Sequence, residues 1–153
     1  MFTNQSHYFH LTSPVRGVPA PVRRAIHHML ASFSEEIKLA ELSEVAGISK
    51  AALNRCFQSR FERTPINWLW TFRAILAKEL INQAPDWDLT DIAFLCGFNS
   101  SAHFSRYFKR VTRISPRDYR QRIRAAGRAP RSFDCSISWN HPSLKAAFLH
   151  MVS

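Results

Sequence analysis

Hydroxyl and cationic side chains recur at helical spacing in residues 100–110. They fall on the face opposite to an apolar stripe made by Phe104, Tyr107, Phe108 and Val111. The polar face consists of Ser101, His103, Ser105, Arg106, Lys109 and Arg110. Residues 49–61 repeat the arrangement, with Lys50, Ala51, Asn54 and Arg55 opposite the core positions. Cations and hydrogen-bonding groups along one helix face are suited to binding a nucleic acid.

Two short helices separated by a glycine turn are expected to position the polar face of residues 100–110. Asp88 is a favourable N-cap for a helix that starts at Leu89, and Gly97 ends that helix because glycine tolerates the left-handed backbone beyond a C-terminus. Ser100 then caps the helix that carries Arg106. Residues 88–111 therefore predict a helix-turn-helix.

Residues 39–61 repeat this pattern, and the repeat can be seen within the sequence itself. An offset of 51 pairs chemically matching residues in the second helices: Ser49 with Ser100, Ala51 with Ala102, Arg55 with Arg106, Phe57 with Phe108, and Pro65 with Pro116. Upstream the offset is 50, which pairs Gly47 with Gly97 and places one extra residue near Asn99. The repeat predicts two similar helix-turn-helix units in one chain.

A long helix over residues 65–83 is expected between the two units. Thr64 caps it, Pro65 occupies its first position, and apolar residues go round most of its circumference. Such a helix packs on several sides, so we expect both units to contact it. Its length of roughly 28 Å approaches one DNA turn of about 34 Å, which would allow two successive major grooves to be read. The fold class predicted is all-α, with two helix-turn-helix subdomains joined by a long central helix.

These residues also resemble a known family. The pairs Ile92-Ala93 and Gly97-Phe98 are followed by Phe104, Arg106, Phe108-Lys109, Ser115-Pro116 and Tyr119-Arg120. This series is similar to the signature of the AraC/XylS-type transcription regulators. The resemblance covers about residues 21–124 and implies a double-stranded DNA-binding domain of two helix-turn-helix units. It further implies sequence-specific transcription regulation, mostly activation beside the polymerase site, with RNA polymerase as a partner.

Carried over by position, the resemblance assigns a role to several outward residues of the second helices. The implied base-contacting residues are Ala51, Asn54, Arg55, Ser101, Ala102, Ser105 and Arg106. We further expect Lys50, Ser100, Lys109, Arg110 and Arg117 to contact phosphates, where they set the register. Arginine can bind guanine O6 and N7, and asparagine can bind adenine N6 and N7. Arg55 and Arg106 are thus expected on guanine and Asn54 on adenine, with a salt bridge or a phosphate contact as the alternative for each arginine.

The sequence departs from the family pattern at three positions. The glycine that usually ends each second helix is replaced by Glu62 and by Arg113, and Ser43 stands where alanine is usual. A left-handed backbone at Glu62 or Arg113 would cost stability. The helices are therefore expected either to end differently or to be less stable.

Composition favours a polyanionic partner. The 153-residue chain carries a net charge of +10. The segment from Arg106 to Arg131 contains ten cationic residues and a single acidic one, Asp118. No segment has the length of a membrane span or the pattern of a signal peptide, which predicts a cytoplasmic protein. The size leaves little room for a sensor, so we expect no small-molecule effector and no cofactor. Two readers in one chain suggest a monomer on DNA.

The ends of the chain carry no defensible motif, and two other functions stay open. Residues 1–20 are expected to be a flexible lead-in and 125–153 a basic linker and tail of unknown role; His7 and His10 are too few for a metal site. One alternative is an interaction protein or antagonist that keeps the fold without reading DNA. The other is a DNA-repair methyl acceptor with Cys56, Cys96 or Cys135 as nucleophile.

Overall fold

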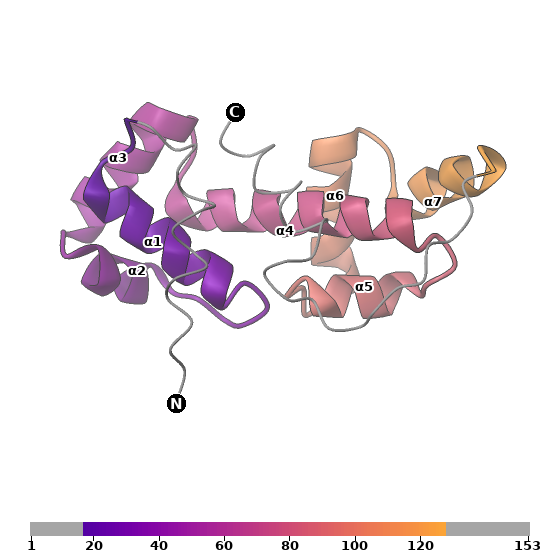
Figure 1. The fold of residues 1–153 in the computed structure, drawn as a ribbon, viewed down its shortest axis with the longest axis horizontal. Helices are drawn as coiled ribbons and strands as arrows, with labels where there is room; N and C mark the ends of the chain where they lie inside the picture. Colours follow the sequence, from indigo (N-terminus) through magenta and orange to yellow (C-terminus); the bar gives the residue numbers. More distant parts are fainter. Residues whose placement is uncertain (1–16, 128–153) are drawn as a thin grey trace. The chain divides into compact units, whose positions relative to one another are not determined.

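A computed structural model describes residues 17–127, which form seven α-helices and contain no strand (Figure 1). The predicted all-α class is confirmed. The proposed tail over 128–153, Cys135 and the His7–His10 pair lie outside the described residues. The chain divides into two compact units: unit 1 runs to Leu69 and unit 2 begins at Trp70, so that the fourth helix contributes to both.

Unit 1 consists of α1 (Ala20–Ala31), α2 (Leu39–Ala46), α3 (Lys50–Phe61) and the first turn of α4 (Pro65–Gln83). Its core comprises Val22, Ala25, Ile26, Met29, Leu30, Leu42, Leu53 and Phe57, all at most 2% exposed. The expected lead-in over 1–20 differs from the structure at its end, because Val18 is buried and α1 already begins at Ala20. Proline in the first turn explains this start, since Pro21 needs no backbone N–H there.

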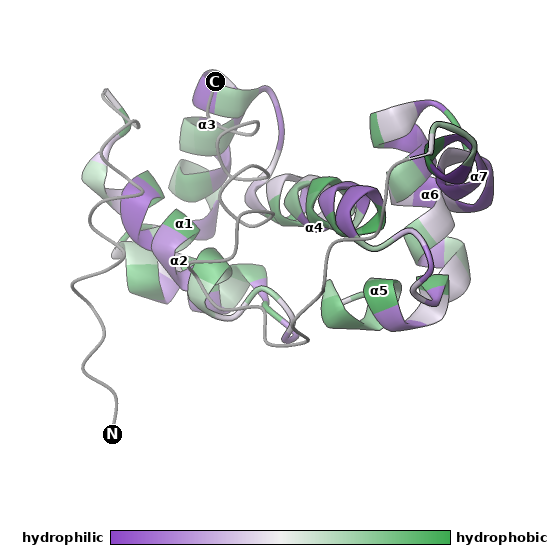
Figure 2. Cartoon of the chain, turned by 45° about the vertical axis from the view of Figure 1, so that its right-hand side comes forward, coloured by the Kyte–Doolittle hydropathy of each residue, from purple (hydrophilic) through white to green (hydrophobic). Residues whose placement is uncertain are grey.

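Unit 2 is built on the remainder of α4 together with α5 (Leu89–Leu95), α6 (Ser101–Thr112) and α7 (Pro116–Ala125). Helix α4 is apolar on several sides, as predicted. Its buried residues within unit 2 are Phe72, Arg73, Ala74, Ile75, Leu76, Ala77, Leu80 and Ile81. Figure 2 shows the contrast with α7, which is coloured almost wholly as hydrophilic.

Polar contacts attach α7 to unit 2, although sequence patterns did not predict this helix. The Tyr119 hydroxyl donates to Asn82 Oδ1 at 2.9 Å, and Arg120 donates to the Trp87 carbonyl at 3.3 Å. Arg124 forms an ion pair with Asp86 at 3.1 Å. Because Pro116 is the only fully buried residue of α7, this helix depends more on hydrogen bonds and charge than on a hydrophobic core.

Caps and turns lie where the sequence predicted them. The hydroxyls of Ser49 and Ser100 accept from the N–H groups of Ala52 and His103, both at 3.2 Å, and Asp88 accepts from Thr90 N–H at 2.7 Å. Gly47 and Gly97 have positive φ angles of 70° and 84°. These contacts fix the starts of α3, α5 and α6 and the direction of each turn.

The second helices each end in a left-handed residue that is not glycine. Glu62 and Arg113 adopt φ angles of 56° and 69°, in the left-handed region, and each donates its N–H to the last turn of its helix. Of the two outcomes expected from the sequence, the structure shows the strained one, in which the backbone geometry is kept at a cost in free energy.

Candidate nucleic-acid interface

Helix α3 presents the first predicted face to solvent. Lys50, Ala51 and Arg55 are exposed, whereas Asn54 is half-buried. Leu53 and Phe57, both 0% exposed, hold the opposite side of α3 in the core of unit 1. Phe57 also contacts Trp68 in the first turn of α4, edge to face with ring centroids 6.4 Å apart. The helix is thus held from behind while its polar face stays open.

Helix α6 presents the second face in the same way. Every predicted contact on it is exposed: Ser101, Ala102, Ser105, Arg106, Lys109 and Arg110, with Ser100 exposed at the N-cap. Phe104 and Phe108 are buried behind them, and Phe108 contacts Tyr119 of α7 at 5.4 Å, as Phe57 contacts Trp68. At about 100° per residue, the predicted contacts cover half the circumference of α6.

Within the described residues neither Arg55 nor Arg106 donates a hydrogen bond or forms an ion pair, so the salt-bridge alternative has no support there. Arg110 lies over the ring of Tyr107, with its guanidinium carbon 5.0 Å from the ring centroid. Arg117, the remaining predicted phosphate contact, is exposed in the first turn of α7. The guanidinium groups of both proposed base-reading arginines therefore remain open to solvent and to a ligand.

An aromatic cluster that the sequence reasoning missed supports α6 from α4. His103, on the inward side of α6, contacts the ring of Trp70 edge to face at 4.1 Å, and Phe98 and Tyr107 lie against the same pair. Burial lowers the pKa of His103 below its usual value, and the positive charges of Arg106 and Arg73 lower it further. His103 is therefore a neutral packing residue at pH 7, although it belongs to the polar set in the sequence.

A buried arginine holds the turn of unit 2. Arg73 of α4 is 2% exposed, lies 4.4 Å from the Trp70 ring centroid and donates to the Gly97 carbonyl at 3.3 Å. Burial lowers its pKa to about 10, so the guanidinium stays charged at neutral pH. Gly97 lies between α5 and α6, so Arg73 fixes the turn that sets the direction of α6.

Unit 1 contains the corresponding anchor. Arg24 of α1 donates to the Ala46 carbonyl, immediately before the turn glycine Gly47. The sequences around the two arginines agree, since Arg24-Ala25-Ile26 corresponds to Arg73-Ala74-Ile75. The repeat thus includes α1 and α4 as well as the helix-turn-helix pairs. This three-residue match was the sequence signal for the two anchors. Its offset of 49 differs from the offsets of 50 and 51 that relate the other pairs, so those offsets do not reveal it.

The structure bears on the cysteine chemistry at one position. Cys96 is fully buried beneath the turn, and burial raises the pKa of its thiol, so it stays protonated and closed to a DNA substrate. Cys56 is half-buried on α3. Among residues 17–127 there is no group of three potential metal ligands, and no helix there is long and apolar enough to span a bilayer.

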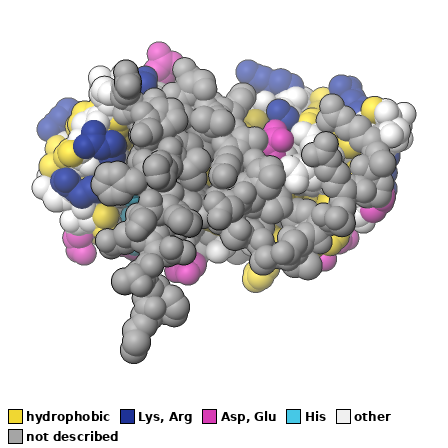
Figure 3. All heavy atoms as spheres, in the orientation of Figure 1, with side chains coloured by type: hydrophobic (Ala, Val, Ile, Leu, Met, Phe, Trp, Pro, Cys, Tyr) yellow, Lys and Arg dark blue, Asp and Glu magenta, His cyan; other side chains and the backbone are white. Residues whose placement is uncertain are grey.

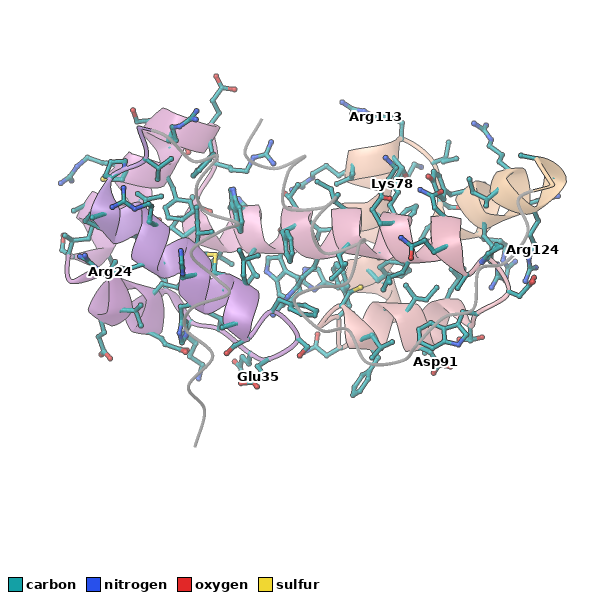
Figure 4. The ribbon with its side chains drawn as sticks, in the orientation of Figure 1. Arg24, Glu35, Lys78, Asp91, Arg113 and Arg124 are labelled. Carbon is teal, nitrogen blue, oxygen red and sulfur yellow. The ribbon has the colours of Figure 1, made fainter. Side chains whose placement is uncertain are left out.

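Charge is segregated within unit 2. Figure 3 shows Lys and Arg side chains gathered over α6 and α7. In Figure 4 Arg113 projects from the end of α6 on one side, while Asp91 of α5 lies on the opposite side. Phe94, on the same helix as Asp91, is 74% exposed. The α6–α7 side is the one whose charge suits a polyanion.

Comparisons with known proteins agree with this geometry. A family model described as a helix-turn-helix domain matches residues 42–122. The transcriptional activator RhaS of Enterobacter sp. strain 638 is 37% identical over 89 residues, which are 58% of this chain and 32% of RhaS. The transcriptional regulator GbdR of Pseudomonas aeruginosa is 34% identical over 93 residues, 61% of this chain and 25% of GbdR. The chain therefore matches between a quarter and a third of the length of these relatives.

Solved structures show the same fold. A Chromobacterium violaceum transcriptional regulator with an AraC-type DNA-binding domain has a TM-score of 0.61 at 25% identity, covering 67% of this chain and 91% of that one. The C-terminal domain of AraT from Geobacillus stearothermophilus has a TM-score of 0.63 at 24% identity, covering 82% and 98%, and supports the fold alone. Together with the family match over more than half of the sequence, the repeated, capped helix pairs show that the chain belongs to the AraC-type helix-turn-helix family of DNA-binding domains.

Proposed function

We propose that this chain is a sequence-specific, double-stranded DNA-binding transcription regulator that reads two adjacent major-groove segments with α3 and α6. One observation carries the proposal: both repeats present an exposed arginine, Arg55 and Arg106, at the same position of a helix whose opposite side is fixed in a core. Exposed guanidinium groups on a convex helix can reach guanine edges in a major groove.

The implied division of labour follows from the side chains on each face. Arg55 and Arg106 bind guanine, Asn54 binds adenine, and Ser101 and Ser105 hydrogen-bond to base edges. Ala51 and Ala102 are short enough to contact a thymine methyl group and to let the helix approach closely. Lys50, Ser100, Lys109, Arg110 and Arg117 bind phosphates and set the register.

Activation through RNA polymerase and binding as a monomer are further parts of the proposal. The name of RhaS as an activator supports the first, and the presence of two readers in one chain supports the second. Control through protein abundance or a partner, without a small-molecule effector, completes it. A stoichiometric small-molecule complex that changes DNA affinity would contradict this last part.

The described residues bear on two other functions. The antagonist hypothesis rested on the missing helix-end glycines and on the C-terminal tail. Glu62 and Arg113 keep the left-handed geometry, and the tail lies outside the described residues. The methyl-acceptor hypothesis needs an accessible thiolate. Cys96 is buried and protonated, Cys56 is half-buried, and Cys135 lies outside the described residues. We therefore propose a protein without enzymatic activity.

Selection of binding sites from random duplexes tests the proposal. We expect two short sequence blocks about one helical turn apart. Arg106→Ala should reduce the base preference within one block by about 1–3 kcal/mol, and Arg55→Ala should do the same in the other block. Lys109→Ala is the matched comparison on the same helix, since loss of a phosphate contact lowers affinity evenly for all sequences. Binding without any sequence preference would refute the proposal.

A further inference from the structure

The two repeats differ sharply in charge at the end of the second helix. In unit 2 the last turn of α6, its left-handed end residue and the first turn of α7 carry Lys109, Arg110, Arg113 and Arg117, all exposed. We call these four residues the basic end of unit 2. At the offset of 51, unit 1 has Gln58, Ser59, Glu62 and Ile66 at the same positions. Every position is cationic in one repeat, and none is in the other.

Equivalent backbone geometry makes this comparison direct. Helices α3 and α6 have the same length and the same offset at both ends, Glu62 and Arg113 share the left-handed conformation, and Pro65 and Pro116 both start the following helix. Unit 1 has two other cations near this end, Arg60 and Arg63. Arg60 lies about 190° round α3 from the centre of the predicted base-contacting face, and Arg63, next to Glu62, is half-buried, unlike the four exposed cations of unit 2. The difference therefore lies in the side chains and not in the scaffold.

The cations of the basic end are open to a ligand. Within the described residues Lys109, Arg113 and Arg117 form no ion pair, and Arg110 contacts only the Tyr107 ring. Other arginines of α7 are engaged, since Arg120 binds the Trp87 carbonyl and Arg124 binds Asp86. The nearby carboxylate of Asp118 accepts a hydrogen bond from the Ser115 hydroxyl and stays at the N-terminal turn of α7.

The position of the basic end on α6 suits a phosphate backbone. From Ser101 to Lys109 the helix rises about 12 Å, which is close to the width of the major groove. A helix whose first turn lies at the base edges then brings its last turn to the phosphates that border the groove. Arg113 projects away from the body of unit 2 at this end (Figure 4), and Figure 3 shows the associated cluster of cations.

We propose that the basic end is a phosphate-binding surface for double-stranded DNA that unit 1 lacks, so that unit 2 supplies most of the salt-dependent affinity. The proposal rests on the proposed function and assigns to Arg113 a DNA contact outside the base-reading face. Unit 1 then contributes chiefly through base recognition by Asn54 and Arg55.

The experiment measures binding to the selected duplex and to a scrambled duplex over a range of salt concentrations. The test variant is the triple substitution Arg110→Gln, Arg113→Asn and Arg117→Gln; asparagine is chosen because it tolerates the left-handed backbone. Loss of three phosphate contacts should reduce the slope of log K against log salt by about 2.7. A fourfold rise in salt would then weaken the variant about 40-fold less than the original protein, equally on both duplexes.

A single-charge comparison separates a surface from net charge. Arg117→Gln and Arg122→Gln remove the same charge from the same helix at positions about 140° apart. We expect the first to reduce the slope by about 0.9 and the second to leave it nearly unchanged. Equal effects of the two substitutions, or an unchanged slope in the triple variant whose helical circular dichroism is intact, would overturn the proposal.

The same data distinguish this inference from the proposed function. If the original protein selects no sequence while the triple variant still loses its salt dependence, the regulator proposal fails and the phosphate surface stands. If a two-block sequence emerges and the triple variant binds with an unchanged slope, the regulator proposal stands and this surface does not.

Discussion

Replacing Arg113 by glycine should stabilise unit 2 and weaken DNA binding at the same time. A left-handed backbone costs a non-glycine residue about 1–2 kcal/mol. Part of the gain from relieving this strain is lost, because glycine increases the conformational entropy of the unfolded chain and so lowers stability by about 0.4–1 kcal/mol. Since Arg113 has φ of 69° and an exposed side chain, we expect a net stabilisation of about 0.5–1 kcal/mol.

Glu62→Gly is the matched change in unit 1, where φ is 56°. It should give the same gain in unfolding free energy, but it removes a negative charge from the end of α3 and so should not weaken DNA binding. Gly47→Ala should have the opposite effect and lower the unfolding free energy of unit 1. At φ of 70° the new Cβ would lie an ordinary 3.5 Å from Arg24 Nη2, so the loss would come from backbone strain alone.

Differential scanning calorimetry and salt-dependent DNA binding together check this set. A gain of 0.5–1 kcal/mol corresponds to a rise of about 2–8 °C in the transition of the altered unit. Arg113→Gly should also reduce the salt slope by about 0.9, whereas Glu62→Gly should not. A lower transition temperature for either glycine variant would show that the end residue makes stabilising contacts that outweigh the strain, and would refute the reasoning.

Three further predictions concern the supports of the helices. Arg73→Ala should destabilise unit 2 by about 2–4 kcal/mol, because it removes buried packing and the partner of the Gly97 carbonyl. Arg24→Ala should destabilise unit 1 by only about 1 kcal/mol, because Arg24 is exposed. Unfolding in urea measures both changes. Ser100→Ala should cost about 1 kcal/mol through loss of the cap on α6, measured in the same way. Because the folded-state pKa of His103 lies below its unfolded value, the unfolded chain takes up the proton first, so stability should fall as pH drops below about 6.5; in His103→Phe, stability measured between pH 5 and 7 should depend less on pH.

Sequence reasoning located the elements whose signals are local. Caps such as Ser49 and Ser100 and the turn glycines depend on one residue and its immediate neighbours, so their types and spacing were sufficient. The outward faces of α3 and α6 followed from helical periodicity, and the exposure of Arg55 and Arg106 agrees with it. Contact of these residues with DNA stays a prediction.

Features that depend on contacts distant in sequence were not predictable in this way. Arg73 is hydrophilic by type, yet it lies in the core because two groups stabilise its guanidinium: the Gly97 carbonyl, brought near by the fold, and the ring of Trp70, one turn earlier on α4. His103 was grouped with the polar face, although Trp70 draws it to the inner side of α6. Helix α7 was missed because its contacts with the α4–α5 connection are polar and leave no apolar stripe. Its local start signal was nevertheless present, since Ser115 and Pro116 begin it as Thr64 and Pro65 begin α4.

The repeated arginine anchors bear on how α3 and α6, the helices proposed to read DNA, are directed. A DNA-reading helix must project its first turn at a defined angle, and a cap fixes only where that helix begins. Arg24 and Arg73 bind the carbonyls of Ala46 and Gly97, at the turn that joins the two helices of each pair. Each arginine comes from the helix that precedes the pair, so it ties the turn to a third element and restricts rotation of the pair. Arg73→Met, which keeps the volume but loses the hydrogen bond, should therefore weaken sequence-specific binding by unit 2 more than salt-dependent binding to a scrambled duplex. Equal losses on both duplexes would show that Arg73 supports the fold of unit 2 without directing α6.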